Sequence, residues 1–176
     1  MAYFAVGSDS FAGGKLAAAR LIERGCRRLA FFGDTRGIEI EQRLAGARAA
    51  VGAAGESASL EAYPVSLSAA EMTGMIEGVL DRMDPATDGI FAASDLIAMA
   101  TLRLLHARGR AVPQDIAVIG FDDLPLAAQT VPLLSTIRQD ICGGAKKMVE
   151  ALRSRISGER CPSAVMEPEL VVRESA

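Results

Sequence analysis

Hydrophobic residues along the chain alternate between short continuous runs and longer stretches with helical spacing. The continuous runs predict buried strands at residues 28–33, 60–65, 89–93 and 115–121. The longer stretches predict helices at residues 15–24, 40–54, 68–82 and 95–107. Ser68 is expected to cap the third helix, and Ser94 or Asp95 the fourth. Strands that are apolar throughout are typical of a parallel sheet with both faces covered. The pattern therefore predicts an α/β fold with a doubly wound parallel sheet.

The regular alternation of strands and helices ends after Asp123. An irregular segment is expected at residues 124–131, followed by a short extended one at 134–138. Residues 142–157 then predict a long helix with an apolar face, and residues 169–173 a final strand. The helix at 142–157 needs a partner for that face, because exposed patches of this kind mark interfaces.

The composition is that of an ordinary globular domain. Of the 176 residues, 50% are hydrophobic and 23% are charged, with a formal net charge of −3. The basic residues are scattered and form no patch of the kind that displaces phosphate counterions. No apolar run approaches the ~20 residues that span a bilayer, and residues 1–6 do not resemble a signal peptide. We therefore expect a cytoplasmic protein that binds no membrane and no nucleic acid directly.

Residues that commonly carry metal or redox chemistry are few and far apart. Cys26, Cys142 and Cys161 lack the C-x-x-C spacing and are expected to be reduced structural thiols. His106 is expected at a solvated helix end, and no cluster of ligating side chains surrounds it. The sequence therefore predicts no metal site and no cofactor.

Motifs for nucleotide binding and nucleophilic catalysis are also missing. The chain contains no G-x-S-x-G and no strand followed by G-x-G-x-x-G. The stretch Gly13-Gly14-Lys15 resembles the end of a phosphate-binding loop. However, Asp9 stands where that loop needs its first glycine, and Leu16 stands where it needs Ser or Thr. We predict that the chain is not an enzyme.

Polar side chains follow the predicted strands, at the edge where ligands bind in open α/β sheets. They are Asp34, Ser66, Ser94, Asp95, Asp122 and Asp123. Arg43, early in the next helix, is close enough to lean over the same edge. Vicinal hydroxyls can donate to a carboxylate and accept from a guanidinium group, so this inventory suits a polyhydroxylated ligand. Loop and cap roles alone remain an alternative, above all for Asp34 and Asp95.

Residues 112–123, VPQDIAVIGFDD, resemble the "VP-D-hydrophobic-V-hydrophobic-GFDD" segment of the LacI/GalR family of transcription regulators. Other segments resemble that family in the same order along the chain: 9–14, 21–25, 43–46, 92–98, 132–140 and 169–175. The segment at 132–140 is similar to a family crossover that favours repressors over periplasmic binding proteins. The resemblance covers essentially the whole chain.

The resemblance implies a periplasmic-binding-protein-like type I fold, in which two α/β lobes close over a small effector. It implies a complete C-terminal lobe, only part of the N-terminal lobe, and no helix-turn-helix headpiece in this chain. The implied divisions are residues 1–25 (remnant of the N-terminal lobe), 26–133 (C-terminal lobe), 134–160 (crossover and N-terminal-lobe helix) and 161–176 (return to the C-terminal lobe). The helices at 15–24 and 142–157 are accordingly expected to lack a sheet that covers their apolar faces.

The resemblance also assigns roles to particular residues. Arg43 matches the arginine that grips the effector, and Asp122 matches the carboxylate that hydrogen-bonds it. Ser94 stands where many members have asparagine, and Asp95 matches a neighbouring aspartate with a more structural role. The positions expected near the effector are completed by Phe11 and by Ser66, which replaces a stacking aromatic residue of some members.

The function implied by the resemblance is that of the sugar-sensing domain of a repressor. The effector would shift lobe closure, and a homodimer would convey that change to operator DNA through headpieces that this chain lacks. Two alternatives stay open. A transport or chemotaxis binding protein would carry a signal peptide, and an enzyme on the same fold would show turnover that depends on Asp122.

Overall fold

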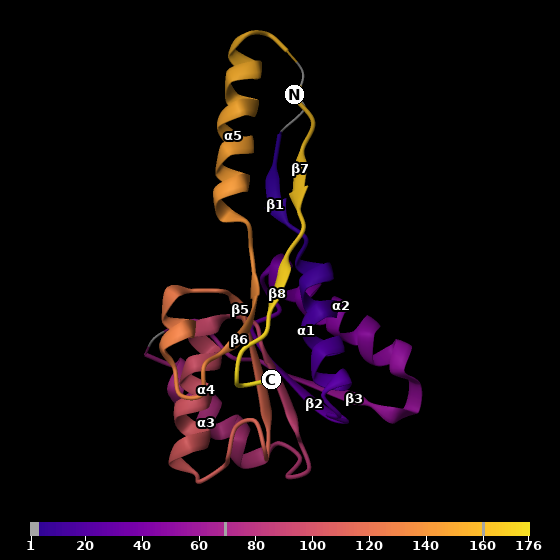
Figure 1. Ribbon diagram of the computed structural model, residues 1–176, viewed down its shortest axis with the longest axis vertical. Coiled ribbons are helices and arrows are strands. Elements are labelled where there is room, and N and C mark those ends of the chain that lie inside the picture. The colour runs from indigo at the N-terminus through magenta and orange to yellow at the C-terminus, as the bar shows by residue number, and fades with distance from the viewer. Residues whose placement is uncertain (1–3, 69, 160) are drawn as a thin grey trace.

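A six-stranded sheet forms the centre of the molecule, in the strand order β3-β2-β4-β5-β6-β8 (Figure 1). The computed structural model describes residues 4–68, 70–159 and 161–176. The strands of this sheet are β2 (Arg28–Phe32), β3 (Ser59–Tyr63), β4 (Gly89–Ala92), β5 (Ala117–Asp122), β6 (Ser135–Arg138) and β8 (Glu169–Val171). Neighbouring strands pair in parallel, except that β8 runs antiparallel to β6. The predicted α/β fold with a parallel sheet is confirmed.

Helices cover both faces of the sheet, because the buried strands are apolar on both sides. Helices α1 (Ser10–Glu23) and α2 (Ile38–Ala54) pack on one face, around a core that contains Phe31, Phe91 and Phe121. Helices α3 (Met72–Arg82) and α4 (Asp95–Ala107) pack on the other face, around Phe32 and neighbouring aliphatic residues. Two short 3-10 helices, η1 (Gly55–Ser57) and η2 (Pro125–Gln129), complete this body.

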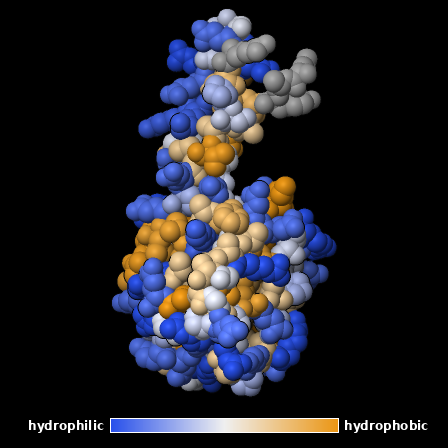
Figure 2. All heavy atoms as spheres, turned by 90° about the vertical axis from the view of Figure 1, so that its right-hand side faces the viewer, coloured by the Kyte–Doolittle hydropathy of each residue, from blue (hydrophilic) through white to orange (hydrophobic). Residues whose placement is uncertain are grey.

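A narrow stalk rises from the body, on the side where the parallel strands end (Figure 1). It consists of helix α5 (Ile141–Ile156) and the parallel pair β1 (Val6–Ser8) and β7 (Ala164–Met166). The apolar face predicted for this helix is present and exposed: Met148, Val149, Leu152 and Ile156 are each more than half exposed. Hydrophobic surface appears on the stalk and on the upper part of the body (Figure 2).

The prediction for the first helix was wrong. Residues 1–25 were expected to be a remnant of the N-terminal lobe, with the helix at 15–24 uncovered. Strand β1 does lie in the stalk, and residues 1–3 are outside the described residues. Helix α1, however, packs on α2 and on the main sheet, where Ala17, Ala18 and Leu21 are fully buried. Its small residues let α1 approach α2 closely, so the buried face is not the one that its larger residues suggested.

Two smaller differences follow from local chemistry. Helix α3 begins at Met72 rather than at residue 68, and residue 69 is outside the described residues. The carbonyl of Ser68 accepts hydrogen bonds from the backbone N–H groups of Glu71 and Met72, so Ser68 forms a turn and does not cap the helix. The C-terminal segment divides as well: β7 belongs to the stalk, β8 joins the main sheet, and residue 160 is not described.

Candidate functional site

Arg43 of α2 is a buried cation at the edge of the sheet that faces the stalk. Only 7% of the residue is exposed, and its guanidinium carbon lies 3.6 Å from the centroid of the Phe121 ring. The Nη1 group donates to the carbonyl oxygen of Ala93, at the end of β4. The Nε group is buried and has no hydrogen-bond partner among the described residues. Arg43 therefore keeps unused donor capacity, which a buried polar group rarely does unless it serves a ligand or water.

The electrostatic surroundings of Arg43 include a carboxylate. Burial lowers the pKa of Arg43, and the nearby charges of Asp122 and Glu39 oppose that change. Burial likewise raises the pKa of Asp122, while Arg43 and a hydrogen bond from Gln139 hold it down. The two groups thus stabilise each other's charged form, as a donor and an acceptor at one site should.

Asp122 ends β5 in an unusual backbone conformation. Its φ is +114° and that of Asp123 is +53°, both in a region that favours glycine. The Oδ1 atom of Asp122 accepts a hydrogen bond of 2.7 Å from Nε2 of Gln139, which lies just beyond β6 in the crossover to the stalk. Residues in such backbone conformations persist where the surroundings over-determine them, and they gather at functional sites. Asp122 is therefore coupled directly to the segment that joins body and stalk.

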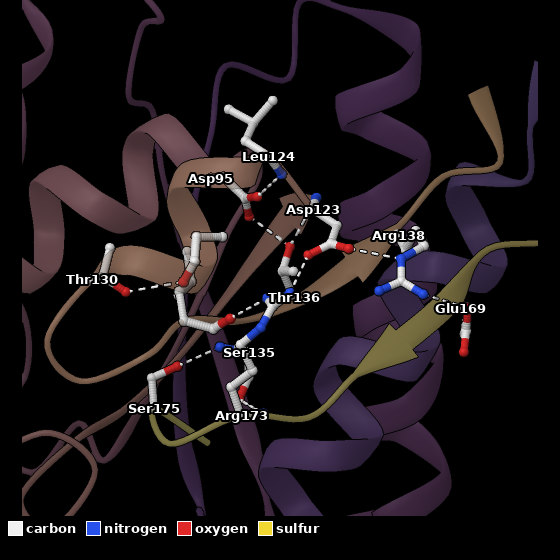
Figure 3. Close-up of polar contacts among 12 residues, drawn as sticks. Asp95, Asp123, Leu124, Thr130, Ser135, Thr136, Arg138, Glu169, Arg173 and Ser175 are labelled. Carbon is white, nitrogen blue, oxygen red and sulfur yellow. Dashed lines mark hydrogen bonds and ion pairs between the residues drawn. The ribbon is translucent and has the colours of Figure 1, made fainter. Parts of the chain in front are cut away.

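The contacts of Asp123 help to hold the backbone of Asp122 and Asp123 in this conformation (Figure 3). Its Oδ1 accepts from Nη2 of Arg173 at 2.6 Å, and its Oδ2 accepts from Nε of Arg138 at 2.7 Å. Arg138 also donates to Glu169 at 3.1 Å. Burial alone would raise the pKa of Asp123, but the two arginines outweigh it and leave the pKa lowered. Asp123 is a structural anchor between β5, β6 and the chain after β8.

Asp95 holds the same loop from the interior (Figure 3). It is fully buried; Oδ1 accepts from the Thr136 hydroxyl at 2.6 Å, and Oδ2 accepts from the backbone N–H of Leu124 at 2.7 Å. Burial raises the pKa of Asp95 to about 6, although these hydrogen bonds oppose the change. Because both oxygens are used within the protein, we assign Asp95 a structural role, in line with what the resemblance implied.

A cavity of about 320 Å³ adjoins Arg43 at the same edge. Its lining comprises Asp34, Gly37, Ile40, Val65, Ser66, Leu67, Ser68, Ala93, Ser94 and Ile97. Ser94 also caps α4, since its Oγ accepts from the backbone N–H of Ile97 at 3.4 Å. The Oγ of Ser66 accepts from the N–H of Ser68 at 3.1 Å. Two of the predicted site residues, Ser66 and Ser94, therefore share one cavity beside Arg43.

Phe11 lies in the first turn of α1 and is 42% exposed. Like Arg43, Asp95 and Asp122, it is not part of that cavity lining. Sequence reasoning in turn missed the role of Gln139. The feature that could have revealed this role is the register of the sheet. Asp122 pairs with Arg138, and this pairing brings the next residue, Gln139, beside the Asp122 carboxylate.

This fold, with polar side chains gathered where parallel strands end, defines the class of protein: a ligand-binding lobe of the periplasmic-binding-protein type. Residues 18–176 match the family of periplasmic binding protein-like domains. The chain belongs to this family, in the form found in LacI-type transcription regulators.

Relatives and solved structures agree with that placement. The HTH-type transcriptional regulator CelR of Thermobifida fusca is 39% identical over 172 residues, which is 95% of this chain and 50% of the relative. The transcriptional regulator CelR–cellobiose complex has a TM-score of 0.89 at 36% identity, covering 98% of this chain and 54% of that one. A LacI family regulator from Enterococcus faecium with bound ribose has a TM-score of 0.87 at 25% identity, covering 98% and 65%. The chain spans about half the length of the curated relatives it matches.

Among the described residues, no helix is both long enough and apolar enough to span a membrane.

Proposed function

We propose that this chain is the effector-sensing domain of a LacI/GalR-type transcriptional repressor, and that its effector is a sugar or a related small polar molecule. The observation that carries the proposal is Arg43: a buried, stacked guanidinium whose Nε–H group has no partner within the described part of the chain, electrostatically coupled to Asp122. Arginine donates to hydroxyl oxygens and aspartate accepts from hydroxyl groups, so the pair suits vicinal hydroxyls. The cellobiose and ribose bound by related regulators support the same ligand class.

The signal would pass through the crossover to the stalk. A hydroxyl that donates to Asp122 shares that carboxylate with Gln139, and it thereby acts on the segment between β6 and α5. An effector with different affinity for two arrangements of body and stalk shifts the balance between them. In a homodimer of the full-length regulator, this shift would alter the affinity of helix-turn-helix headpieces for operator DNA.

Several negative expectations belong to the same proposal. A sensing domain needs no catalytic group, metal or cofactor, so we propose that the chain is not an enzyme. A repressor acts where its operator lies, so we place the protein in the cytoplasm, without a membrane partner.

The proposal can be tested by titrating the ¹⁵N-labelled chain with glucose, ribose and cellobiose while following backbone amide signals. The candidate site residues named above all lie on the body. Because this is one side of the site only, we expect a dissociation constant of ~1 mM. Arg43→Lys and Asp122→Asn should each weaken binding by about 10-fold or more. Lysine lacks the planar fork of the guanidinium group, and the asparagine NH2 group would face the sugar hydroxyls that donate to Asp122.

Arg48→Lys is the matched control, because Arg48 is exposed on the same helix. It should leave sugar binding unchanged. Binding that survives both site substitutions at full strength would overturn the site. The absence of any sugar response in a folded chain would overturn the function.

A further inference from the structure

The stalk is joined to the body by three short connections, which run from β1 to α1, from β6 to α5 and from β7 to β8 (Figure 1). A backbone hydrogen bond of 2.9 Å from the N–H of Asp9 to the carbonyl of Met166 ties the first connection to the third. Within the part of the chain that the structure describes, α5, β1 and β7 pack mainly on one another, and none of them packs extensively on an element of the body. Because no large packed interface fixes the stalk, its orientation depends on these connections and on the contacts of their side chains.

Two of the connections leave the main sheet at the same point. Arg138 is the last residue of β6 and Glu169 is the first residue of β8, and the two are partners in the antiparallel pairing of these strands. The pairing comprises only three residue pairs, so the outer pair is a large part of it. Strand ends open more readily than strand centres. If the outer pair opens, both connections gain a free residue and the stalk gains freedom to tilt.

The side chains of Arg138 and Glu169 close this outer position (Figure 3). The Nη1 group of Arg138 donates to Oε2 of Glu169 at 3.1 Å. These side chains are 46% and 69% exposed, and an isolated pair with such exposure contributes little. This pair is not isolated, because Nε of Arg138 also donates to Oδ2 of Asp123 at 2.7 Å, and only 11% of the Asp123 side chain is exposed. The guanidinium group is therefore already oriented when it meets Glu169, which lowers the entropy cost of the contact.

The contacts of Asp123 hold the other side of this guanidinium group to the body. Asp123 also accepts a hydrogen bond of 2.6 Å from Nη2 of Arg173, and Arg173 in turn donates to the carbonyl of Leu134 at 2.7 Å. The exposed and more easily released partner is therefore Glu169, at the start of the strand that returns from the stalk.

We propose that Arg138 and Glu169 form a clasp that limits the tilt of the stalk against the body. The clasp is closed while the two side chains are paired, and it opens when their attraction is screened or removed. Its anchored half is Arg138, which Asp123 holds to the body, and its releasable half is Glu169. This inference concerns the joint between body and stalk, so it can be tested independently of the proposed sugar effector.

Glu169→Lys tests the clasp, because it places a second positive charge beside Arg138 at an exposed position. Glu167→Lys is the matched control. Glu167 is exposed, lies in the same connection two residues earlier, and forms no ion pair with any residue that the structure describes. The two variants therefore share the same change of charge and differ in whether a clasp partner is lost.

The measurement is the distribution of distances between a nitroxide label on the body and one on the stalk, obtained by double electron–electron resonance. Arg103→Cys on α4 and Arg153→Cys on α5 provide two exposed labelling positions. Cys142→Ser and Cys161→Ser remove the two accessible native thiols, while Cys26 is buried and stays unlabelled.

Glu169→Lys should widen the distance distribution about 2-fold, because it shifts the clasp from mostly closed to mostly open. Glu167→Lys should leave the width unchanged, and Glu169→Gln, which removes the attraction without adding repulsion, should give an intermediate width. Raising NaCl from about 0.1 M to about 1 M shortens the Debye length from ~10 Å to ~3 Å. This should widen the distribution of the unmodified chain, where an attraction is screened, and narrow that of Glu169→Lys, where a repulsion is screened.

Several results would overturn the clasp. One is a width in Glu169→Lys equal to that of the unmodified chain, and another is equal widening in Glu169→Lys and Glu167→Lys. An unmodified chain whose distribution ignores salt would overturn it without any variant. Urea unfolding should give the same midpoint for all these proteins, because the pair is exposed. A lower midpoint in Glu169→Lys would show that Glu169 supports the whole fold rather than the joint, and it too would overturn the proposal.

Discussion

A Cβ atom at Gly14 would lie 1.9 Å from the carbonyl oxygen of Arg43, so α1 and α2 cross backbone to backbone at this point. Gly46 repeats the arrangement, with its Cβ position 1.9 Å from the carbonyl oxygen of Phe11. Side chains normally keep packed helices 8–10 Å apart, and glycines on both sides remove that spacer. The crossing fixes the backbone from which the Arg43 side chain reaches Phe121 and Ala93.

Gly14→Ala should force the two helices apart. The clash is with backbone, which cannot rotate away, so we expect a loss of about 1–3 kcal/mol in the free energy of unfolding. Sugar binding should weaken as well, because Arg43 moves with α2. Urea unfolding measures the first effect and amide titration the second. Gly52→Ala, on the open side of α2, should instead gain up to about 1 kcal/mol. Equal stability of the two variants would contradict the crossing.

Asp95 should make the stability of the protein depend on pH. Its pKa is about 6 in the folded chain, against an ordinary value of 3.8, so folding favours the protonated form. The stabilisation is therefore complete below about pH 4 and is lost as the pH rises through 6. Over that interval the loss amounts to about 3 kcal/mol. Asp95→Asn, which stays neutral, should escape it.

The measurement compares urea unfolding of the two proteins between pH 4 and pH 7. Asparagine can accept from the Leu124 N–H and donate to the Thr136 oxygen, so the loop it holds should survive. Asp122, whose pKa is also raised, acts in the same direction but is present in both proteins. Stability curves that run parallel across the whole range would show that Asp95 is ionised in the fold.

Arg173 should contribute more to stability than an exposed arginine with a similar partner. It donates to Asp123 at 2.6 Å and to the carbonyl of Leu134 at 2.7 Å, and only 16% of its side chain is exposed. Arg173→Met leaves the Asp123 carboxylate short of a donor and should cost about 2 kcal/mol. Arg36→Met removes the pair with Asp34, where 87% of the Arg36 side chain is exposed, and should leave the urea midpoint unchanged. A larger loss of stability in Arg36→Met than in Arg173→Met would contradict the anchor role of Asp123.

Much of the fold could be predicted because its strands are continuous apolar runs in the sequence. The runs at 89–93 and 115–121 correspond closely to β4 and β5, and the helix at 40–54 to α2. The placement of α1 could not be predicted in this way. Its buried face consists of Gly13, Gly14, Ala17 and Ala18 with Leu21, and small residues give no strong amphipathic signal. What buries them is the backbone of α2 at Arg43 and Gly46 together with Phe121 and Ile137 of the sheet, and this packing is a tertiary property.

The candidate site, too, could be predicted from the sequence only in part. Ser66, Ser94 and Asp122 could be proposed from their positions after strands, and Arg43 from its place early in a helix, and the structure gathers them at one edge. The distinct roles of Asp122 and Asp123 could not be read from two adjacent identical letters. They arise from positive φ angles that turn one carboxylate toward Gln139 and the other toward two arginines.

Cys26 should be nearly inert in the folded chain. It lies just before β2, is 6% exposed, and its thiol donates to the carbonyl of Asp88 at 3.3 Å. Burial, and next the charge of Asp88, raise its pKa to about 11, so thiolate is scarce at pH 8. In a chain that keeps only this thiol (Cys142→Ser with Cys161→Ser), reaction with a disulfide reagent should be roughly 100-fold slower than in denaturant. Native reaction at the denatured rate would mean that the turn between α1 and β2 opens readily, and with it the packing of α1 on the body that holds Arg43 in place.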